Sequence, residues 1–407
     1  MNILVVSQYF WPEPFRINDL CEQLVSEGHK VTVLTGVPNY PEGEVYTDFA
    51  NEPGAFGEYK GCEIIRCNLV PRGQGSKLKL IANYLSYVFS ASKEVLFNLR
   101  KREFDVVFVC QLSPATVALP AILYKWFRKT PIVMWVLDLW PESLSEAGGI
   151  NNKFVLSGAG MMMKFIYRNT DLVLAQSQSF AKELARRTVS DKVAFFPNWA
   201  EDIFSTVSHQ AGALLDRDEG KINILFAGNV GWSQGFEHVV DAMKIVKENN
   251  ISARLHIVGD GRALQDTKQR VAEYGLEEQV VFYGRHPLES MPQFYSEADV
   301  CFVTLANSPA FSMTIPGKVQ SYLAAGKPTL AVLNGDGAEV IENAECGLVS
   351  ASGDAHALAQ NIEQMSALNK GQLQEMGEKA RQYSQQHFDR DRLIKTLIGK
   401  FEIVTGK

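Results

Sequence analysis

A carboxylate at the end of an apolar run is the first residue whose position could do chemistry. The run IVMWVL ends at Asp138, and Trp140, Pro141 and Glu142 follow it closely. A carboxylate at a sheet edge beside an aromatic wall can hydrogen-bond sugar hydroxyls or assist removal of a proton, and apolar surroundings can tune its pKa. We therefore predict catalytic roles for Asp138 and Glu142. The alternative for Glu142 is a carboxylate in the first turn of the next helix, favoured by the helix dipole.

A lysine at the start of a helix is the second such residue. In the stretch CFVTLANSPAFSMTIPGKVQSYLAAGKP a strand should end near Thr304, and a loop with Pro316 and Gly317 should lead into a helix from about Lys318 to Gly326. A helix N-terminus plus an ammonium group makes a positive pocket for a diphosphate without any cation. We predict that Gly317 and Lys318 bind a nucleotide diphosphate and that Lys318 stabilises it as it departs.

Two strand–glycine–helix units precede this stretch, ILFAGNVGWSQGFEHVVDA and LHIVGDGRALQDTKQRV. Glycines let the backbone approach a ligand closely, and the helix that follows can face a phosphate. The predicted nucleotide contacts here are Gly228, Asn229, Gly259, Gly261 and Arg262. Tight packing turns would explain either unit on its own.

Three more charged residues are candidates for ligand contacts. Glu339 follows a strand through Gly335 and Gly337 and could accept hydrogen bonds from a ribose, with a helix N-terminal carboxylate as the alternative. Arg285 could add positive charge for the phosphates. Arg16, in the first loop SQYFWPEPFRIND, could bind an anion or a sugar hydroxyl, with a surface salt bridge as the alternative. That loop has no glycine, which argues against an NAD-dependent oxidoreductase.

These residues must be positioned by parallel sheets, because short β-branched runs alternate with helical stretches throughout the chain. Strands are expected at residues 3–6, 31–34, 63–66, 105–109, 132–137, 172–175 and 193–196, and at 222–226, 255–258, 280–283, 300–303, 329–333 and 347–349. Each half therefore predicts its own doubly wound α/β sheet, with residues 199–221 as the linker. A chain of 407 residues suits two such domains, and two domains imply a cleft.

Composition excludes several other classes of protein. The chain is 46% hydrophobic and 21% charged, so it is neither disordered nor of low complexity. Its six cysteines form no C-x-x-C pair and indicate reduced, buried thiols. The D-x-D triplets 216–218 and 389–391 follow no apolar strand, and the histidines lack metal spacing, so we expect no bound metal and no cofactor.

Charge is distributed unevenly along the chain. Residues 71–129 carry ten basic side chains and three acidic ones, a balance of +7 in a chain whose net charge is -6. The basic residues flank apolar positions with amphipathic helical spacing, which favours a membrane surface over nucleic acid. A core-facing helix with a solvated basic face is an equal alternative. A transmembrane segment at 106–124 is disfavoured by its interrupting polar and proline residues.

The sequence resembles the family 4 retaining glycosyltransferases of the GT-B fold, and within them the WbuB-like O-antigen transferases. The resemblance covers essentially the whole chain and rests on VPNYPEGEVY (37–46), DLWPES (138–143), FPNWAED (196–202) and KVQSYLAAGKP (318–328). It implies two Rossmann-like domains facing a cleft: an acceptor domain at 1–200, with Arg16, Asn39 and Tyr40 as acceptor contacts, and a nucleotide-sugar domain at 221–385. Residues 386–407 would form a helix that crosses back to the first domain.

The resemblance also implies a UDP-sugar donor, with N-acetyl-L-fucosamine as the candidate sugar, and a lipid-linked saccharide acceptor of O-antigen or lipopolysaccharide biosynthesis. The sequence departs from the family at the two glutamates before the A-x-G-K-P turn, which are Met313 and Ser321 here, and at two basic positions, which are Asn229 and Gln234. Ser321 is retained as a candidate donor contact.

We expect a cytoplasmic enzyme, peripheral at the inner membrane face, since the N-terminus reads as a β-strand without the basic region of a signal peptide. The alternatives are a sugar-nucleotide epimerase or hydrolase of the same architecture and a non-catalytic partner of a transferase complex.

Overall fold

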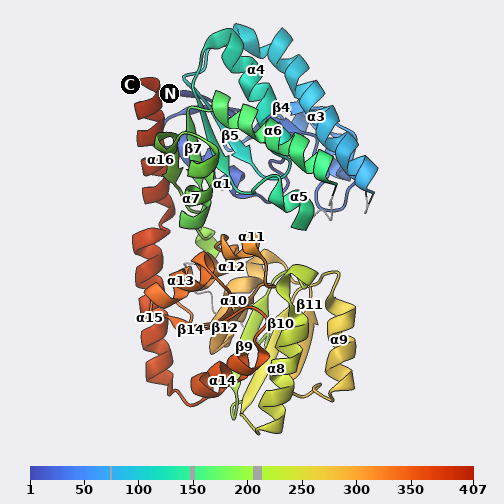
Figure 1. The fold of residues 1–407 in the computed structure, drawn as a ribbon, viewed down its shortest axis with the longest axis vertical. Coiled ribbons are helices and arrows are strands. Elements are labelled where there is room, and N and C mark those ends of the chain that lie inside the picture. The colour runs from blue at the N-terminus through green and yellow to red at the C-terminus, as the bar shows by residue number, and fades with distance from the viewer. Residues whose placement is uncertain (74–75, 147–151, 205–212) are drawn as a thin grey trace. The chain divides into compact units, whose positions relative to one another are not determined.

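The computed structural model describes residues 1–73, 76–146, 152–204 and 213–407, with the side chains of Lys77 and Glu146 left out (Figure 1). The chain forms two compact units. Unit 1 comprises Met1–Pro197 together with Asp391–Lys407, and unit 2 comprises Asn198–Arg390. Each unit is described by itself below.

Unit 1 is built on an eight-stranded sheet in the order β3-β4-β2-β1-β5-β6-β7-β8, in which β3 alone is antiparallel. Its strands are β1 (Asn2–Val6), β2 (Lys30–Gly36), β3 (Glu58–Tyr59), β4 (Cys62–Cys67), β5 (Val106–Gln111), β6 (Ile132–Val136), β7 (Leu172–Ala175) and β8 (Val193–Phe195). Its helices are α1 (Arg16–Ser26), α2 (Thr47–Asn51), α3 (Lys77–Phe97), α4 (Ala118–Arg128), α5 (Glu142–Glu146), α6 (Lys153–Asn169), α7 (Gln178–Arg187) and α16 (Arg390–Thr405).

The last helix belongs to unit 1 although unit 2 precedes it in the sequence. The ring of Phe401 on α16 packs edge-on against Phe108 of β5, with centroids 5.7 Å apart. Lys407 forms an ion pair with Asp105, at 2.5 Å. These contacts fix the end of the chain to the central strands of the sheet.

Unit 2 is built on a six-stranded parallel sheet in the order β11-β10-β9-β12-β13-β14. Its strands are β9 (Ile222–Ala227), β10 (Ala253–Val258), β11 (Val280–Gly284), β12 (Val300–Thr304), β13 (Thr329–Val332) and β14 (Gly347–Ser350). Its helices are α8 (Phe236–Glu248), α9 (Leu264–Glu273), α10 (Met291–Glu297), α11 (Pro309–Ser312), α12 (Gly317–Ala324), α13 (Asp336–Asn343), α14 (Ala355–Ser366) and α15 (Lys370–His387).

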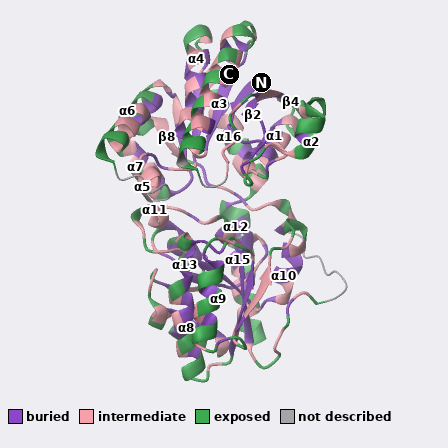
Figure 2. Ribbon diagram, turned by 90° about the vertical axis from the view of Figure 1, so that its right-hand side faces the viewer, coloured by how far each residue is buried: buried purple, intermediate pink, exposed green. Residues whose placement is uncertain are grey.

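Helices cover both faces of this second sheet, so that successive residues of a strand enter different cores. In β9, Ile224 and Phe226 pack with α8, α9 and α14, whereas Leu225 and Ala227 pack with α10, α12, α13 and α15. Figure 2 shows the strands buried and the helices exposed on their outer faces. The near-continuous apolar runs of the sequence follow from this double coverage.

All thirteen predicted strands are confirmed within a few residues, and among the residues that the structure describes only the two-residue β3 was missed. The stretch 106–124 is divided between β5 and α4. Within the described ranges, none of the helices combines the length and the apolar character that crossing a bilayer requires. All six cysteines are unpaired and buried, as expected for structural thiols.

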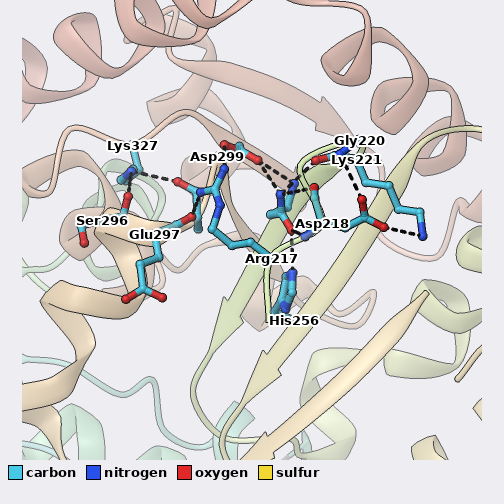
Figure 3. Close-up of polar contacts among 11 residues, drawn as sticks. Arg217, Asp218, Gly220, Lys221, His256, Ser296, Glu297, Asp299 and Lys327 are labelled. Atoms are coloured by element: carbon cyan, nitrogen blue, oxygen red, sulfur yellow. Dashed lines mark hydrogen bonds and ion pairs between the residues drawn. The ribbon is translucent and has the colours of Figure 1, made fainter. Parts of the chain in front are cut away.

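The predicted linker is too long at its end, because residues 213–221 pack into unit 2; residues 205–212 lie outside the described part. Glu297 accepts hydrogen bonds from the backbone of Leu214 and Leu215, and Arg217 pairs with Asp299 at 3.1 Å (Figure 3). Asp299 also accepts from the buried Asn223 at the start of β9. Burial lowers the pKa of the neighbouring His256 to about 4, so that this ring is neutral.

Candidate active site

The Lys318 side chain lies at the carboxyl edge of the unit 2 sheet, at the point where the strand order reverses. Strand β9 is followed in the chain by β10 on one side, while β12 pairs with β9 on the other. Ligands of doubly wound sheets bind outside the carboxyl ends of the strands at such a point. Gly228 directly follows β9, and the Lys318 side chain covers it so closely that a Cβ there would lie 2.4 Å from Cε of the lysine.

The ammonium group of Lys318 is held by two neighbours. Its Nζ donates to Oε1 of Gln234 at 2.9 Å and lies 4.3 Å from the centre of the Phe226 ring. No carboxylate within the described ranges forms a recorded ion pair with Lys318. Burial lowers the pKa of Lys318 to about 8, and a diphosphate would offset that cost.

Gln234 is itself fixed from two sides. It ends the short 3-10 helix Trp232–Gln234, and its carbonyl accepts from the hydroxyl of Thr304 at the end of β12, at 2.8 Å. Ser233 accepts from the backbone N–H of Ala306. The first glycine loop is thereby tied to the strand on the other side of the reversal, which orients the Lys318 ammonium.

The N-terminus of α12 lies beside this ammonium. The helix begins at Gly317, one residue before the predicted start, and its N-cap is Pro316, which has no side-chain oxygen to cap the first N–H groups. Those groups and the helix dipole favour an anion. Ser321 stays a predicted donor contact; its hydroxyl is buried and donates to the carbonyl of Gly317, at 3.1 Å.

The two glycine loops pack directly against each other. A Cβ at Gly259 would lie 1.8 Å from the carbonyl oxygen of Gly228, and one at Gly261 would lie 2.3 Å from that of Val230. Close packing of the two loops therefore explains why glycine occupies positions 259 and 261. Such packing was the alternative to a nucleotide contact in the sequence analysis. Gly228 differs, because the absence of a side chain there leaves space for the side chain of Lys318.

The other predicted donor residues lie along the carboxyl edge of the same sheet. Asn229 and Arg262 are exposed on the two glycine loops, and Arg285 is exposed just after β11. Glu339 is exposed in the first turn of α13. This is the position expected if Glu339 is a helix N-terminal carboxylate, the alternative to a ribose contact. The structure thus brings Lys318, Gly228 and Gly317 together. The other charged candidates, Arg262, Arg285 and Glu339, lie exposed at the carboxyl edge of the sheet.

In unit 1, Asp138 lies two residues beyond β6 in a largely enclosed position. Burial raises its pKa, and the hydroxyls of Ser143 and Ser113 act in the opposite direction. The backbone carbonyl of Asp138 accepts from Gln111 at the end of β5, at 2.8 Å. Trp140 donates to Ser113 at 3.0 Å, which fixes the aromatic wall.

Glu142, predicted as a catalytic residue, forms an ion pair with Arg187. Both of its carboxylate oxygens accept from Arg187, at 2.8 and 2.9 Å, and Arg187 also pairs with Glu183. Glu142 is the first residue of α5, as the alternative for it stated. A bidentate ion pair of this kind holds α5 and α7 together and leaves Asp138 as the better candidate for proton transfer.

Glu13 is a buried carboxylate that the sequence analysis did not single out. Its Oε1 accepts from the backbone N–H groups of Asn39 and Tyr40, at 2.9 and 2.7 Å, and Oε2 accepts from Phe10 at 3.3 Å. Burial raises the pKa of Glu13 to about 7. A glutamate between Pro12 and Pro14 in an apolar loop was the available signal.

The hydrogen bonds from Glu13 hold two of the predicted acceptor residues, Asn39 and Tyr40. Asn39 is buried, and its oxygen accepts from the backbone of Arg72 at 3.1 Å, while the Arg72 guanidinium lies 4.9 Å from the Tyr40 ring centre. Tyr40 is half-buried against Phe15, with ring centres 5.2 Å apart. Arg16 is the first residue of α1 and is half-buried.

Both D-x-D triplets are engaged in ion pairs. Asp216 pairs with Arg254 and Asp218 with Lys221, and Arg390, the middle residue of the second triplet, pairs with Asp202. Across the described residues, no group of three or more His, Cys, Asp or Glu side chains is placed to hold a metal ion.

Two family models match the chain, one in each half: the glycosyl transferase 4-like domain at residues 15–199 and the glycosyl transferases group 1 at residues 213–383. The probable glycosyltransferase WbjE of Pseudomonas aeruginosa is 30% identical over 323 residues, 75% of this chain and 77% of that protein. The putative colanic acid biosynthesis glycosyl transferase WcaI of Escherichia coli K12 is 25% identical over 347 residues, 80% of this chain and 82% of that protein.

Among solved structures, the Anabaena protein HepE in complex with UDP and glucose superposes with a TM-score of 0.68 at 15% identity, covering 99% of each chain. The two parallel α/β sheets define the GT-B fold that was predicted. The chain belongs to the group 1 glycosyltransferases, and it is an enzyme of that class.

Proposed function

We propose that this enzyme transfers a sugar from a UDP-sugar to a lipid-linked saccharide in the biosynthesis of a surface polysaccharide of the O-antigen or lipopolysaccharide type, with retention of the anomeric configuration. The observation that carries the donor half is the Lys318 ammonium over Gly228, beside the uncapped N-terminus of α12. The names of WbjE and WcaI, one of them a putative colanic acid transferase, support the polysaccharide class. HepE, of the same fold, binds UDP and glucose.

In this proposal the bond between the anomeric carbon and the diphosphate oxygen breaks as the acceptor oxygen bonds to the same face of that carbon. The acceptor proton passes to Asp138 or to the departing diphosphate. Lys318 and the α12 N–H groups stabilise the negative charge that develops, a contribution commonly worth about 3–4 kcal/mol. Glu142 holds α5 through its ion pair with Arg187.

Unit 1 receives the acceptor through Arg16, Asn39 and Tyr40, with the last two fixed by Glu13. The basic, apolar segment at 77–129 would bring the protein to the inner face of a membrane, where a lipid diphosphate is presented. N-acetyl-L-fucosamine is the sugar we propose to test first, on the resemblance to the WbuB-like transferases.

A panel of nucleotide sugars tested by thermal shift, followed by transfer assays on a short-chain lipid diphosphate saccharide, tests the proposal. We expect one UDP-sugar to raise the unfolding midpoint and to yield a product whose anomeric proton coupling shows retention. Free sugar or an epimer formed without acceptor would instead indicate a hydrolase or epimerase. Binding without turnover on any acceptor would indicate the non-catalytic partner, a possibility raised by Met313 and Ser321.

Asp138→Asn tests the proton-transfer role within the same assay. Because the amide keeps the shape but cannot take a proton, we expect the rate of transfer to fall roughly 10²-fold or more with the donor-induced thermal shift unchanged. A folded variant with near-normal transfer would remove Asp138 from this role. The matched control is Ser145→Ala, which removes a hydroxyl that donates to the carbonyl of Glu142 within α5.

A further inference from the structure

Helix α3 is apolar on two opposite sides. Its buried side is formed by Asn83, Tyr87, Ala91, Val95 and Leu99, spaced by four residues along α3 and the turn after it. The exposed positions Ile81, Leu85, Phe89 and Phe97 each stand two residues away from a buried one, about 200° around the helix. Phe89 is 77% exposed and Leu78, in the first turn, is 79% exposed. Lys93 is exposed in the same stripe, but the other four positions are apolar, so the outward side is not the solvated basic face of an ordinary core helix.

Helix α6 repeats this arrangement and was not singled out from the sequence. It buries Met163, Ile166 and Tyr167 and exposes Phe154, Met161 and Phe165, with Phe154 88% exposed. The exposed positions follow the i, i+7, i+11 spacing of one helical stripe. Such a row of large apolar side chains is rare on the free surface of a monomeric protein and marks an interaction site.

Helix α4 joins the two stripes. It packs against both α3 and α6, and the three helices lie beside one another in Figure 1. At its end the exposed Trp126 contacts Phe165 of α6, with ring centres 6.2 Å apart, and Phe127 is also exposed. We call the exposed apolar residues of α3, α4 and α6 the outer face of unit 1.

The charge around the outer face selects its partner. The segment 77–102 has six basic residues and one acidic residue, and α6 has Lys153, Lys164 and Arg168 and no acidic residue. All three basic residues of α6 are exposed. In a symmetric contact a second copy would bring the same basic residues to this face, so a second copy is not the complementary partner. Basic side chains that border an apolar stripe complement an anionic lipid surface.

We propose that the outer face of unit 1 is a membrane-docking surface for an anionic bilayer, in which Phe154, Met161 and Phe165 of α6 enter the lipid beside the α3 stripe. This proposal rests on the proposed function, because docking would bring the enzyme to a lipid-linked acceptor. It goes beyond the segment 77–129 by assigning insertion to a separate helix, α6.

Flotation of the full-length protein with vesicles of neutral phosphatidylcholine, with and without 30% phosphatidylglycerol, tests the docking surface. We expect binding mainly to the anionic vesicles, weakened by salt. Phe154→Ser with Phe165→Ser should reduce binding roughly tenfold or more, and Lys164→Glu with Arg168→Glu should abolish the preference for anionic lipid. The matched control is Val189→Ser with Ile403→Ser, two apolar residues that are 60% and 81% exposed on other elements of unit 1.

Unchanged vesicle binding by the folded α6 variants would overturn the proposal, as would absence of binding by the wild type. Concentration-dependent self-association without lipid that Phe154→Ser with Phe165→Ser abolishes would show that a second copy covers the face. Transfer to a short-chain, water-soluble acceptor separates the two proposals. If the α6 variants keep that transfer and lose vesicle binding, both stand; if the wild type binds vesicles but transfers nothing, only the proposed function fails.

Discussion

The ammonium of Lys318 lies 2.9 Å from the side-chain oxygen of Gln234, although 84 positions separate them in the chain. By resemblance, position 234 carries a basic residue in the wider family, and here that residue is an amide. The lysine at the start of α12 brings its positive charge to the same place from another element. The proposed donor site therefore keeps a cation, supplied from another position in the sequence.

Exchanging the two side chains should test this relationship. We expect Lys318→Gln to lower the rate of transfer roughly 10²-fold, because a donor to the developing charge is lost. The double variant Lys318→Gln with Gln234→Lys should regain at least about tenfold, since the charge returns to nearly the same point. Steady-state kinetics of both variants is the measurement, and a double variant no better than Lys318→Gln would count against the exchange.

The pH dependence of donor binding should report the ionisation of Lys318. The group is charged below its pKa of about 8, so affinity for UDP should fall as the pH rises above 8, and binding near pH 8–9 should take up a proton. Calorimetry in buffers of different ionisation enthalpy measures that uptake. Lys318→Met should show no uptake; uptake that persists in this variant would assign it to another group.

The same lysine should lower the stability of the unliganded protein. Its pKa is below the value of 10.5 for a free lysine, so the folded state binds the proton more weakly and stability from this group rises between about pH 8 and 10.5. At pH 7 the full cost is present. We expect Lys318→Met to be more stable by about 1–2 kcal/mol in urea unfolding at pH 7, and a less stable variant would contradict this.

Gly228 and Gly259 lie side by side in the structure, and alanine at each should have a different main effect. Gly228→Ala should chiefly weaken donor binding, and Gly259→Ala should chiefly lower stability. At Gly228, where φ is +145°, a side chain strains the backbone by about 1–2 kcal/mol and its Cβ meets the flexible Lys318 side chain, so we expect weaker donor binding with that loss of stability. At Gly259 a Cβ meets the backbone of Gly228 at 1.8 Å, so we expect a loss of roughly 3 kcal/mol or more. Unfolding curves and UDP titrations of the two variants separate these outcomes, and equal losses of stability would contradict the distinction.

Glu13 should make the stability of unit 1 depend on pH. Its pKa of about 7 exceeds the usual 4.5, so the folded state binds the proton more tightly and stability from this group falls as the pH rises from about 4.5 to 7. The Arg66 guanidinium acts against this shift. Glu13→Gln should flatten that part of the profile, measured by urea unfolding, whereas an unchanged slope would assign it elsewhere.

Glu13→Ala should have a further effect, because it leaves the N–H groups of Asn39 and Tyr40 without their acceptor. We expect a loss of about 2–3 kcal/mol and a higher KM for the acceptor, with the donor affinity unchanged. A change in donor affinity alone would contradict the placement of this loop on the acceptor side.

Much of the fold follows from the sequence because its strands are buried on both faces and read as apolar runs such as ILVV and IVMWV. The two residues of β3 lack such a run and could not be found that way. The end of the linker was misjudged because residues 216–221 are polar, and because the residues that hold this segment, Glu297 and Asp299, lie about 80 positions away.

The candidate site was only partly predictable. Position after a strand located Asp138, since parallel strands bring their carboxyl ends to one edge, and the predicted start of a helix located Lys318. Which oxygen a serine or glutamate contacts depends on distant residues, so the helix bond of Ser321 and the pairing of Glu142 with Arg187 required the structure. Glu13 and Gln234 were missed because each acts through a partner far along the chain.

Isothermal titration of UDP and of uridine into the wild type and Lys318→Met tests the central claim most directly. If the Lys318 pocket holds the diphosphate, the variant should bind UDP roughly 10²-fold more weakly while uridine binds both proteins alike. Wild-type affinity of the folded variant for UDP would contradict the claim.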